Sequence, residues 1–361
     1  MSRLKVLSVV GARPQFIKAF PVSDALRRDH DEVLVHTGQH YDESMSGVFF
    51  DELAIPEPDY NLGVGSGGHA AQTAEMMTRL DAVVADEAPD VVLVYGDTNS
   101  TLAAALVAAK RDPVLAHVEA GLRSHNWAMP EEVNRVVTDH CSDLLFAPSE
   151  SAAETLAAEG IRDGVSVTGD VQYDAVLRVR EAARERSTIL GDLDLRDGEY
   201  VLATVHRAAN TDDRDRLEGI VEGLASSELP VVFPVHPRTE GALEASGLWS
   251  RLADAENVVP VEPVGYLDFV RLLDGAERVA TDSGGVQKEA FYLDTRCLTL
   301  RDETEWTETV DAGWNVLVGA DATAIRAALA DDDPLPEKPS LYGDGSAAER
   351  IVAALSEYED A

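Results

Sequence analysis

Three acidic side chains and one histidine lie where a general acid–base catalyst would need them. Asp97 and Glu119 each come at the end of an apolar run. Glu131 begins a segment with helical spacing, and His206 ends another apolar run. Carboxylates and imidazoles held close together in a partly dry site can remove and return protons, because neighbouring charges tune their pKa values. We therefore take these four residues as candidate catalytic groups.

Each candidate also has an ordinary structural explanation. Asp97 could cap the helix that follows it. Glu131 could favour the first turn of a helix after Pro130, and Arg135 could be its partner one turn later. His206 could be a hydrogen-bonded histidine near the core. The residue types alone leave these alternatives open.

The composition indicates that most acidic residues lie on the surface. The 361 residues include 66 Asp and Glu against 30 Lys and Arg, which gives a net charge of −36. Such a surface repels nucleic acid and anionic membranes, and it is typical of a protein that stays soluble in high salt. The two cysteines form no disulfide or metal framework. The stretch MSRLKVLSVVGARP has no signal-peptide pattern and no run is long enough to span a membrane, so we expect a cytoplasmic protein.

Short apolar runs alternate with amphipathic segments along the whole chain. The runs cover 4–10, 31–37, 90–96, 113–119, 144–149, 165–169, 200–206, 230–237, 257–263, 277–283 and 296–300. This alternation predicts an α/β fold with two doubly wound parallel sheets. We place an N-terminal domain at 1–170 and a C-terminal domain at 171–361, joined through the charged and turn-rich segment 171–198. The last helix, within 331–361, could pack across onto the first domain.

Polar residues follow most of these predicted strands, and ligands of doubly wound sheets bind beyond the strands' carboxyl ends. Two sheets with such edges predict a cleft between the domains. The best local signal is TDSGGVQKEA at 281–290, where a Ser283-Gly284-Gly285 turn opens a helix. Such a helix start can bind phosphate, and Glu289 could accept bonds from ribose hydroxyls. The alternative is an ordinary strand–turn–helix.

Other chemistries find little support. His117-Val118-Glu119 matches the H-x-E of zinc deaminases, but no P-C-x-x-C follows. His36 and His40 flank a glycine and do not form a helical metal pair. The chain has no G-x-G-x-x-G after its first strand and no Walker loop, which argues against nicotinamide and P-loop chemistry.

The motifs taken together resemble the non-hydrolysing UDP-N-acetylglucosamine 2-epimerases. They are GARPQFIKAFP, TGQHYD, VYGDTNST, HVEAGLRS, MPEEVNRV, TGDVQYDA, TVHRAAN, PVHPR and DSGGVQKEA. The resemblance runs from about residue 5 to 320. It implies two Rossmann-like domains in the glycosyltransferase-B arrangement, with UDP held mostly by the second. It also implies a homodimer and an isomerase without a metal or another cofactor.

Carried over residue by residue, the resemblance assigns roles. The implied catalytic groups are Asp97, Glu119, Glu131 and, close to the diphosphate, His206. The implied nucleotide contacts are Arg13, Lys18, Phe269, Ser283, Gly284, Gly285 and Glu289. Positions that match parts of a second, activating UDP-sugar site are Gln39, His40, Gln72, Arg207 and His236. In the implied reaction, UDP leaves C1 by anti elimination while C2 loses its proton, and re-addition to 2-acetamidoglucal gives the C2 epimer. Glu132 is expected to support its helix.

The chain departs from the family pattern at three positions. Val264 replaces a frequent Gln, Trp306 replaces an Arg in RDETEWTE, and Ala71 replaces an Arg of the activating site. The run RDETEW is more similar to the related 2-epimerases of UDP-2,3-diacetamido-2,3-dideoxyglucuronic acid, which are the main alternative. Arg123, Arg135 and Arg301 are then candidate partners for the substrate carboxylate. A glycosyltransferase or a non-catalytic UDP-sugar sensor would share the fold, but the sensor would not need the four candidate catalytic groups.

Overall fold

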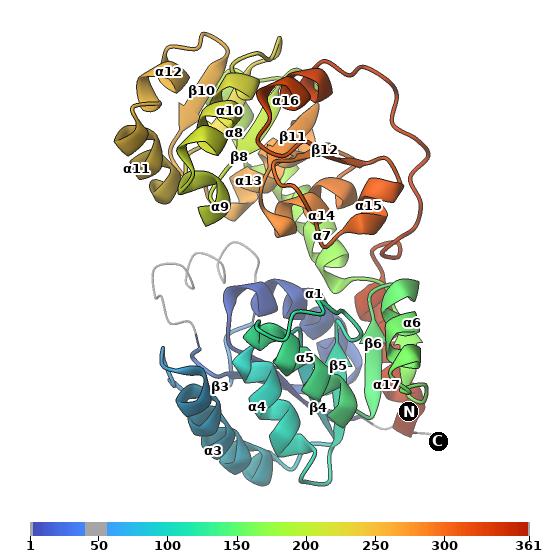
Figure 1. Cartoon of the computed structure of the whole chain (residues 1–361). Helices are drawn as coiled ribbons and strands as arrows, with labels where there is room; N and C mark the ends of the chain where they lie inside the picture. The colour runs from blue at the N-terminus through green and yellow to red at the C-terminus, as the bar shows by residue number, and fades with distance from the viewer. Residues whose placement is uncertain (1–2, 40–55, 360–361) are drawn as a thin grey trace. The chain divides into compact units, whose positions relative to one another are not determined.

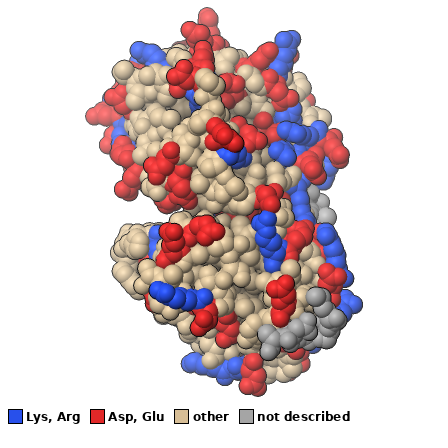
Figure 2. Space-filling view, turned by 90° about the vertical axis from the view of Figure 1, so that its right-hand side faces the viewer, with Lys and Arg blue, Asp and Glu red and all other residues tan. Residues whose placement is uncertain are grey.

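Two parallel sheets organise the chain, each in its own unit. The computed structural model describes residues 3–39 and 56–359. Unit 1 comprises Met1–Ala175 and Ser340–Ala361, and unit 2 comprises Val176–Pro339 (Figure 1). In the described part of the chain, every helix is too short or too polar to cross a membrane. Asp and Glu side chains are spread over the face seen in Figure 2, with fewer Lys and Arg between them.

The sheet of unit 1 has seven parallel strands in the order β3-β2-β1-β4-β5-β6-β7. The strands are β1 (Lys5–Val10), β2 (Asp31–His36), β3 (Tyr60–Asn61), β4 (Val91–Tyr95), β5 (Val114–Val118), β6 (Leu144–Ala147) and β7 (Val165–Val167). The order reverses direction beside β1, as in Rossmann-like domains. The carboxyl ends of β1, β4 and β5 therefore lie next to one another at the point where ligands usually bind.

Helices cover both faces of this sheet (Figure 1). They are α1 (Arg13–Asp29), α3 (His69–Glu87), α4 (Asn99–Ala108), α5 (Pro130–Cys141), α6 (Glu150–Ala158) and α17 (Ala347–Glu359). Leu7, Val9 and Val94 of the strands share a buried core with Met76 and Leu80 of α3. This packing makes the sheet a rigid base for the loops at its carboxyl edge.

Unit 2 repeats the architecture with six parallel strands in the order β10-β9-β8-β11-β12-β13. The strands are β8 (Val201–Thr204), β9 (Val231–Pro234), β10 (Val258–Val261), β11 (Arg278–Thr281), β12 (Arg296–Thr299) and β13 (Asn315–Leu317). The helices are α8 (Ile189–Asp192), α9 (Ala208–Thr211), α10 (Arg214–Leu224), α11 (Pro237–Ser246), α12 (Trp249–Ala253), α13 (Tyr266–Gly275), α14 (Gly284–Tyr292), α15 (Thr307–Asp311) and α16 (Ala322–Leu329). The predicted α/β class with two Rossmann-like domains is confirmed, whereas the cleft between them stays a prediction.

The last segment of the chain returns to unit 1. Residues from Ser340 onward belong to unit 1, where α17 packs against α1. The carboxylate of Asp174, in α7 (Val171–Arg186), accepts the backbone N–H groups of Ala347 and Ala348 at 3.1 and 2.8 Å. His30 Nε2 lies 2.9 Å from Ser356 Oγ at the far end of α17. These bonds are buried, so the last helix is part of the first domain's structure.

Candidate active site

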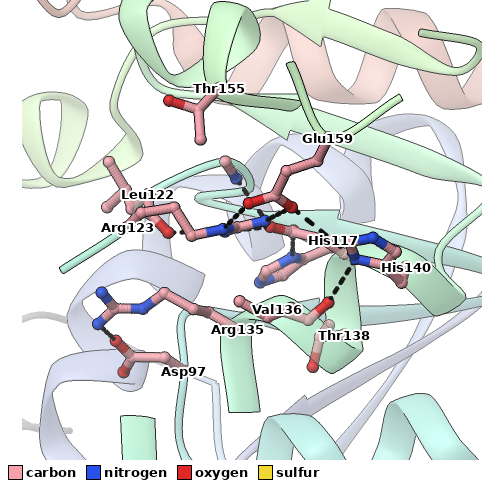
Figure 3. A network of polar contacts seen from close by, with 12 residues as sticks. Asp97, His117, Leu122, Arg123, Arg135, Val136, Thr138, His140, Thr155 and Glu159 are labelled. Carbon is pink, nitrogen blue, oxygen red and sulfur yellow. Dashed lines mark hydrogen bonds and ion pairs between the residues drawn. The ribbon is translucent and has the colours of Figure 1, made fainter. Parts of the chain in front are cut away.

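Asp97 lies in the turn after β4 and forms an ion pair with Arg135 of α5 (Figure 3). The helix that follows is capped by Thr98, whose side chain accepts the N–H of Thr101, so Asp97 is not the cap. The backbone carbonyl of Asp97 also accepts the Asn134 amide at 2.9 Å. Arg135 therefore pairs with Asp97 rather than with Glu131, and this ion pair holds the Asp97 carboxylate at the carboxyl edge of the sheet.

Glu119, directly after β5, pairs with Lys18 of α1. Its backbone φ is +73°, a left-handed conformation that few residues other than glycine adopt and that often marks a functional site. A Cβ on Gly96 would come within 3.2 Å of Glu119 Oε2, so a glycine keeps space for this carboxylate. Burial alone would lower the pKa of Lys18, but Glu119, together with the charges of Asp97 and Asp170, raises it. Lys18 is thus a permanent ammonium beside two carboxylates.

The adjacent acids Glu131 and Glu132 differ sharply in their surroundings. Glu131 is exposed in the first turn of α5 and forms no ion pair or hydrogen bond with another described residue. Glu132 is 1% exposed, and its oxygens accept the N–H groups of Ser124 and His125 and the Ser124 hydroxyl at 2.8–2.9 Å. Arg135 also pairs with Glu132. Glu132 therefore holds the loop before α5, whereas Glu131 is available to a ligand.

A network of polar contacts around His117 and Arg123 connects several elements of unit 1 (Figure 3). His117 of β5 donates to Asp139 Oδ1 at 2.7 Å and to the Gly96 carbonyl at 2.8 Å. Arg123 joins Asp139 to Glu159, with contacts of 2.7 and 2.8 Å. Burial would raise the pKa of Asp139, but His117 and Arg123 lower it. The network links β4, β5, α5 and the end of α6.

In unit 2, Asp282 holds His206 at the carboxyl end of β8. The Asp282 carboxylate accepts the backbone N–H groups of His206 and Arg207 and the Asn210 amide at 3.0–3.1 Å, and it lies 3.1 Å from His206 Nδ1. Burial would raise the pKa of Asp282, but these partners lower it. The His206 side chain is 43% exposed and is therefore not a core histidine. An aspartate behind the ring orients its other nitrogen outward.

The turn after β11 forms the start of helix α14. The Ser283 hydroxyl caps the helix by accepting the Val286 N–H at 3.4 Å. A Cβ on Gly284 would lie 2.3 Å from Glu305 Oε1, whereas a Cβ on Gly285 would have only Ser283 Oγ nearby, at 3.9 Å. Gly285 therefore leaves the backbone N–H groups of the helix start accessible to a phosphate.

A pocket of about 260 Å³ opens beside this helix start, within unit 2. Its lining is mostly apolar and includes Thr204, His206, Pro263, Val264, Phe269 and Ser283. Glu289, one turn along α14, accepts the Tyr266 hydroxyl at 2.8 Å. An apolar slot, an accessible helix start and a carboxylate match the base, phosphate and ribose of a nucleotide.

Trp306 packs the first turn of α14. Its indole N–H donates to the Gly284 carbonyl at 2.9 Å, and Lys288 Nζ lies 4.4 Å from its ring centre. The neighbouring Glu305 pairs with Arg301 at 2.8 Å. The indole thus stabilises the start of α14.

The residues of the expected activating site lie in both units. In unit 1, Gln39 accepts the N–H and hydroxyl of Ser100 at 3.0 and 2.7 Å, and Gln72 bonds Gly65 O and Asn99 Nδ2 at 2.7 and 2.8 Å. In unit 2, His236 Nδ1 accepts the Arg238 N–H, so a neutral ring has its proton on Nε2. Arg207 is 41% exposed and lies 3.9 Å from Glu305. His40 and the side chain of Arg13 lie outside the described residues.

Asp139 and Asp282 were not predicted as members of the site, and Arg135 pairs with Asp97 and Glu132 rather than with Glu131, which was one alternative for it. Asp282 had a usable signal, because it is an acid at a strand end directly before a helix-opening turn. Asp139 lies in the last turns of α5 and has no comparable signal. Its role depends on the distance between a helix and a strand, which spacing along the chain does not give.

The chain is similar to known proteins over nearly its whole length. A profile of the UDP-N-acetylglucosamine 2-epimerase family matches residues 24–356. A "UDP-N-acetylglucosamine 2-epimerase homolog" of Methanococcus maripaludis is 47% identical over 98% of this chain and 99% of its own. The UDP-2,3-diacetamido-2,3-dideoxy-D-glucuronate 2-epimerase of Pseudomonas aeruginosa is 46% identical with the same coverage. A crystal structure of the Methanocaldococcus jannaschii UDP-GlcNAc 2-epimerase with UDP-GlcNAc and UDP superposes with a TM-score of 0.81, at 42% identity and over 98% and 100% of the two chains.

Proposed function

The chain belongs to the UDP-N-acetylglucosamine 2-epimerase family of isomerases, and we propose that it interconverts UDP-N-acetylglucosamine and UDP-N-acetylmannosamine by inverting C2. The observation that carries this proposal is the Lys18–Glu119 ion pair beside Asp97 at the ends of β4 and β5. A proton that is removed from one face of C2 and returned to the other requires more than one acid–base group. The cluster at these strand ends supplies such groups.

The reaction proceeds by elimination and re-addition. A base takes the C2 proton, the C2–H electron pair forms a C1=C2 double bond, and the C1–O bond breaks so that UDP leaves with its electron pair. The products of this half-reaction are 2-acetamidoglucal and UDP. Return of UDP to C1 and of a proton to the opposite face of C2 gives the epimer. Each bond that breaks in this reaction is matched by a bond that forms, so the reaction requires neither an oxidant nor a metal.

The carboxylates of unit 1 supply the proton transfers. Asp97 and Glu119 each form an ion pair with a cation, and the ionised form is the one that a general base requires. Glu131 stands one turn before Arg135 on the same face of α5, so it points toward the Asp97 side of the helix. Its solvent-exposed position suits a group that exchanges protons with water between turnovers.

Unit 2 binds the nucleotide. The base occupies the pocket lined by Phe269 and Val264, the diphosphate accepts N–H groups at Gly284 and Gly285, and a ribose hydroxyl donates to Glu289. His206 lies at the edge of the same pocket and can donate to the leaving diphosphate. Charge that develops on UDP as the C1–O bond breaks is stabilised by these donors.

The substrate is UDP-N-acetylglucosamine rather than the diacetamido uronic acid. A substrate carboxylate would need a cation, and the three arginines considered for that role have carboxylate partners. Arg123 is 2% exposed and pairs with Asp139 and Glu159. Arg135 pairs with Asp97 and Glu132, and Arg301 pairs with Glu305. The sequence similarity to the Pseudomonas aeruginosa enzyme keeps the uronic acid as the second candidate.

One NMR experiment compares the candidates. The purified protein is incubated separately with each UDP-sugar and without an acceptor. We expect signals of UDP-N-acetylmannosamine to appear from UDP-N-acetylglucosamine. Turnover of the uronic acid alone would overturn the substrate, and release of UDP only in the presence of an acceptor sugar would indicate a transferase.

Activation by a second UDP-sugar is weak or absent in this proposal. Ala71 is exposed in the first turn of α3, where the family pattern has an arginine. A diphosphate without that guanidinium loses about 1.5–3 kcal/mol of charge-assisted hydrogen bonding. The rate should therefore depend on the concentration of UDP-N-acetylglucosamine as expected for independent sites. The resemblance further supports a homodimer. The acidic surface supports a protein that works in a cytoplasm rich in salt.

A further inference from the structure

His117 is a buried histidine whose two ring nitrogens both face oxygen acceptors. Nδ1 lies 2.7 Å from Asp139 Oδ1 and Nε2 lies 2.8 Å from the carbonyl oxygen of Gly96. A carbonyl oxygen only accepts hydrogen bonds, so Nε2 carries a proton. Asp139 Oδ2 accepts the Gly121 N–H at 3.1 Å and Arg123 Nη1 at 2.7 Å. The other neighbours of this carboxylate are donors, and the charge of Arg123 helps to lower the pKa of Asp139, so the carboxylate is an acceptor on both of its oxygens.

The first bond of His117 fixes the turn that carries Asp97. Gly96 is the residue before Asp97, and its carbonyl accepts His117 Nε2–H. The Gly96 N–H donates to the Val118 carbonyl at 3.0 Å, one residue before Glu119. Gly96 has a φ of +61°, a left-handed conformation that glycine adopts readily. The turn after β4 is therefore bonded to β5 on both sides.

The second bond of His117 fixes α5 and the loop after Glu119. Asp139 lies near the end of α5, whose first turn carries Glu131. The same carboxylate holds Gly121 and Arg123, which follow Glu119 in the chain. A Cβ on Gly121 would collide with the Ala152 carbonyl at 2.3 Å, so this loop has little freedom. One buried ion pair thus reaches the three segments that carry the proposed catalytic carboxylates.

We propose that the His117–Asp139 ion pair is a positioning device that holds Asp97, Glu119 and α5 in their relative places for proton transfer at C2. The inference rests on the proposed epimerase function and adds residues that act through others. His117 is 0% exposed and Asp139 is 1% exposed, so neither contacts the substrate. Displacement of a reacting group by about 1 Å can lower a rate by about 10²-fold, so the pair matters for kcat rather than for nucleotide binding.

Two substitutions separate the two bonds of His117. His117→Asn places an amide nitrogen at the Nδ1 position, so it can keep the bond to Asp139 and loses the bond to Gly96. His117→Gln places one at the Nε2 position, so it can keep the bond to Gly96 and loses the bond to Asp139. We expect kcat to fall by at least about 10-fold in each, with KM for UDP-N-acetylglucosamine within about 3-fold, because most of the proposed nucleotide contacts are in unit 2 and His117 touches none of them.

His30 provides a matched control. It is also a buried histidine of unit 1, 2% exposed, but it lies before β2 at the opposite edge of the sheet and bonds Ser356 and the Leu4 N–H. His30→Gln should lower the melting temperature and leave kcat within about 2-fold of the wild type. If His30→Gln lowers kcat as much as the His117 variants do, at an equal loss of stability, the His117–Asp139 pair is merely structural and the proposal is overturned.

A third variant decides the case if the His117 variants do not fold. Asp139→Asn keeps the shape of the side chain and one acceptor oxygen, and it should also lower kcat without a matching rise in KM. A folded Asp139→Asn protein with wild-type kcat would overturn the proposal whatever the His117 variants do. Wild-type turnover in the same assay tests the proposed function separately, because inactive wild-type protein would contradict the epimerase assignment and not the positioning role alone.

Discussion

Lys18 of α1 forms an ion pair with Glu119 at the end of β5, within the field of Asp97. The pair places a permanent positive charge beside two carboxylates that are 22 residues apart in the sequence. Glu119 reaches Lys18 from a left-handed backbone conformation, with φ of +73°. Strained conformations of this kind persist where the surrounding structure enforces them, often for function.

Replacing Lys18 by Met should lower kcat by about 10²-fold. Met has a similar length but leaves Glu119 without its cation and removes the charge that Asp97 experiences. Steady-state kinetics with UDP-N-acetylglucosamine provide the measurement. Lys5→Met is the control, because Lys5 pairs with Glu87 at 2.7 Å at the start of β1, at the opposite edge of the sheet from the strand ends that carry Asp97 and Glu119, and is partly exposed. Equal kcat values of the two variants would show that Lys18 has no role in the active site.

Glu131 and Glu132 should respond in opposite ways to the change from acid to amide. Glu131→Gln should lower kcat by about 10²-fold and leave the melting temperature nearly unchanged, since the side chain is exposed. Glu132→Gln should lower the melting temperature by several degrees, because a carboxylate that accepts three bonds from Ser124 and His125 is lost. Thermal scans and kinetics on both variants test this, and the reverse pattern would exchange their roles.

These contrasts indicate what the sequence could and could not predict. All eleven predicted apolar runs contain a strand, because fully buried parallel strands are continuous in Val and Leu. Strands β3 and β13 were missed, since Tyr60–Asn61 and Asn315–Leu317 are too short to show a pattern. Asp97 and Glu119 could be found from their places at strand ends. The Asp97–Arg135 and His117–Asp139 pairs could not, because they depend on how α5 packs on the sheet.

Asp282 should make stability fall in acid. Its pKa is lowered in the folded protein, since the partners that include His206 and Asn210 outweigh burial. A lowered carboxyl pKa contributes stability that is full above the unfolded value of about 3.9 and is lost as the pH falls through the folded value. Asp282→Asn should therefore melt roughly 4–10 °C below the wild type at pH 7. This gap should narrow towards pH 3.

Asp302→Asn serves as the comparison for the acid experiment. Asp302 is 73% exposed in its ion pair with Arg216, so its replacement should change the melting temperature little at any pH. A gap for Asp282→Asn that stays constant from pH 7 to pH 3 would show that its carboxylate adds no pH-dependent stability.

The melting temperature of the wild type should rise from dilute buffer to molar KCl. The 66 acidic residues exceed the 30 Lys and Arg by 36, so many carboxylates repel one another without a cationic partner of their own. Salt screens this repulsion, and the Debye length falls to about 3 Å at 1 M. An osmolyte such as sucrose at equal osmolality should stabilise the protein less. A melting temperature that is flat or falling with KCl would remove the high-salt interpretation.

The most direct test of the proposed chemistry is NMR of the reaction in deuterated water. If C2 loses its proton and UDP leaves from C1, the epimer and the recovered UDP-N-acetylglucosamine should both carry deuterium at C2. Asp97→Asn, Glu119→Gln and Glu131→Gln should slow the appearance of label and epimer by about 10²-fold or more. An epimer that forms with its original C2 hydrogen, or undiminished turnover in all three variants, would contradict the account.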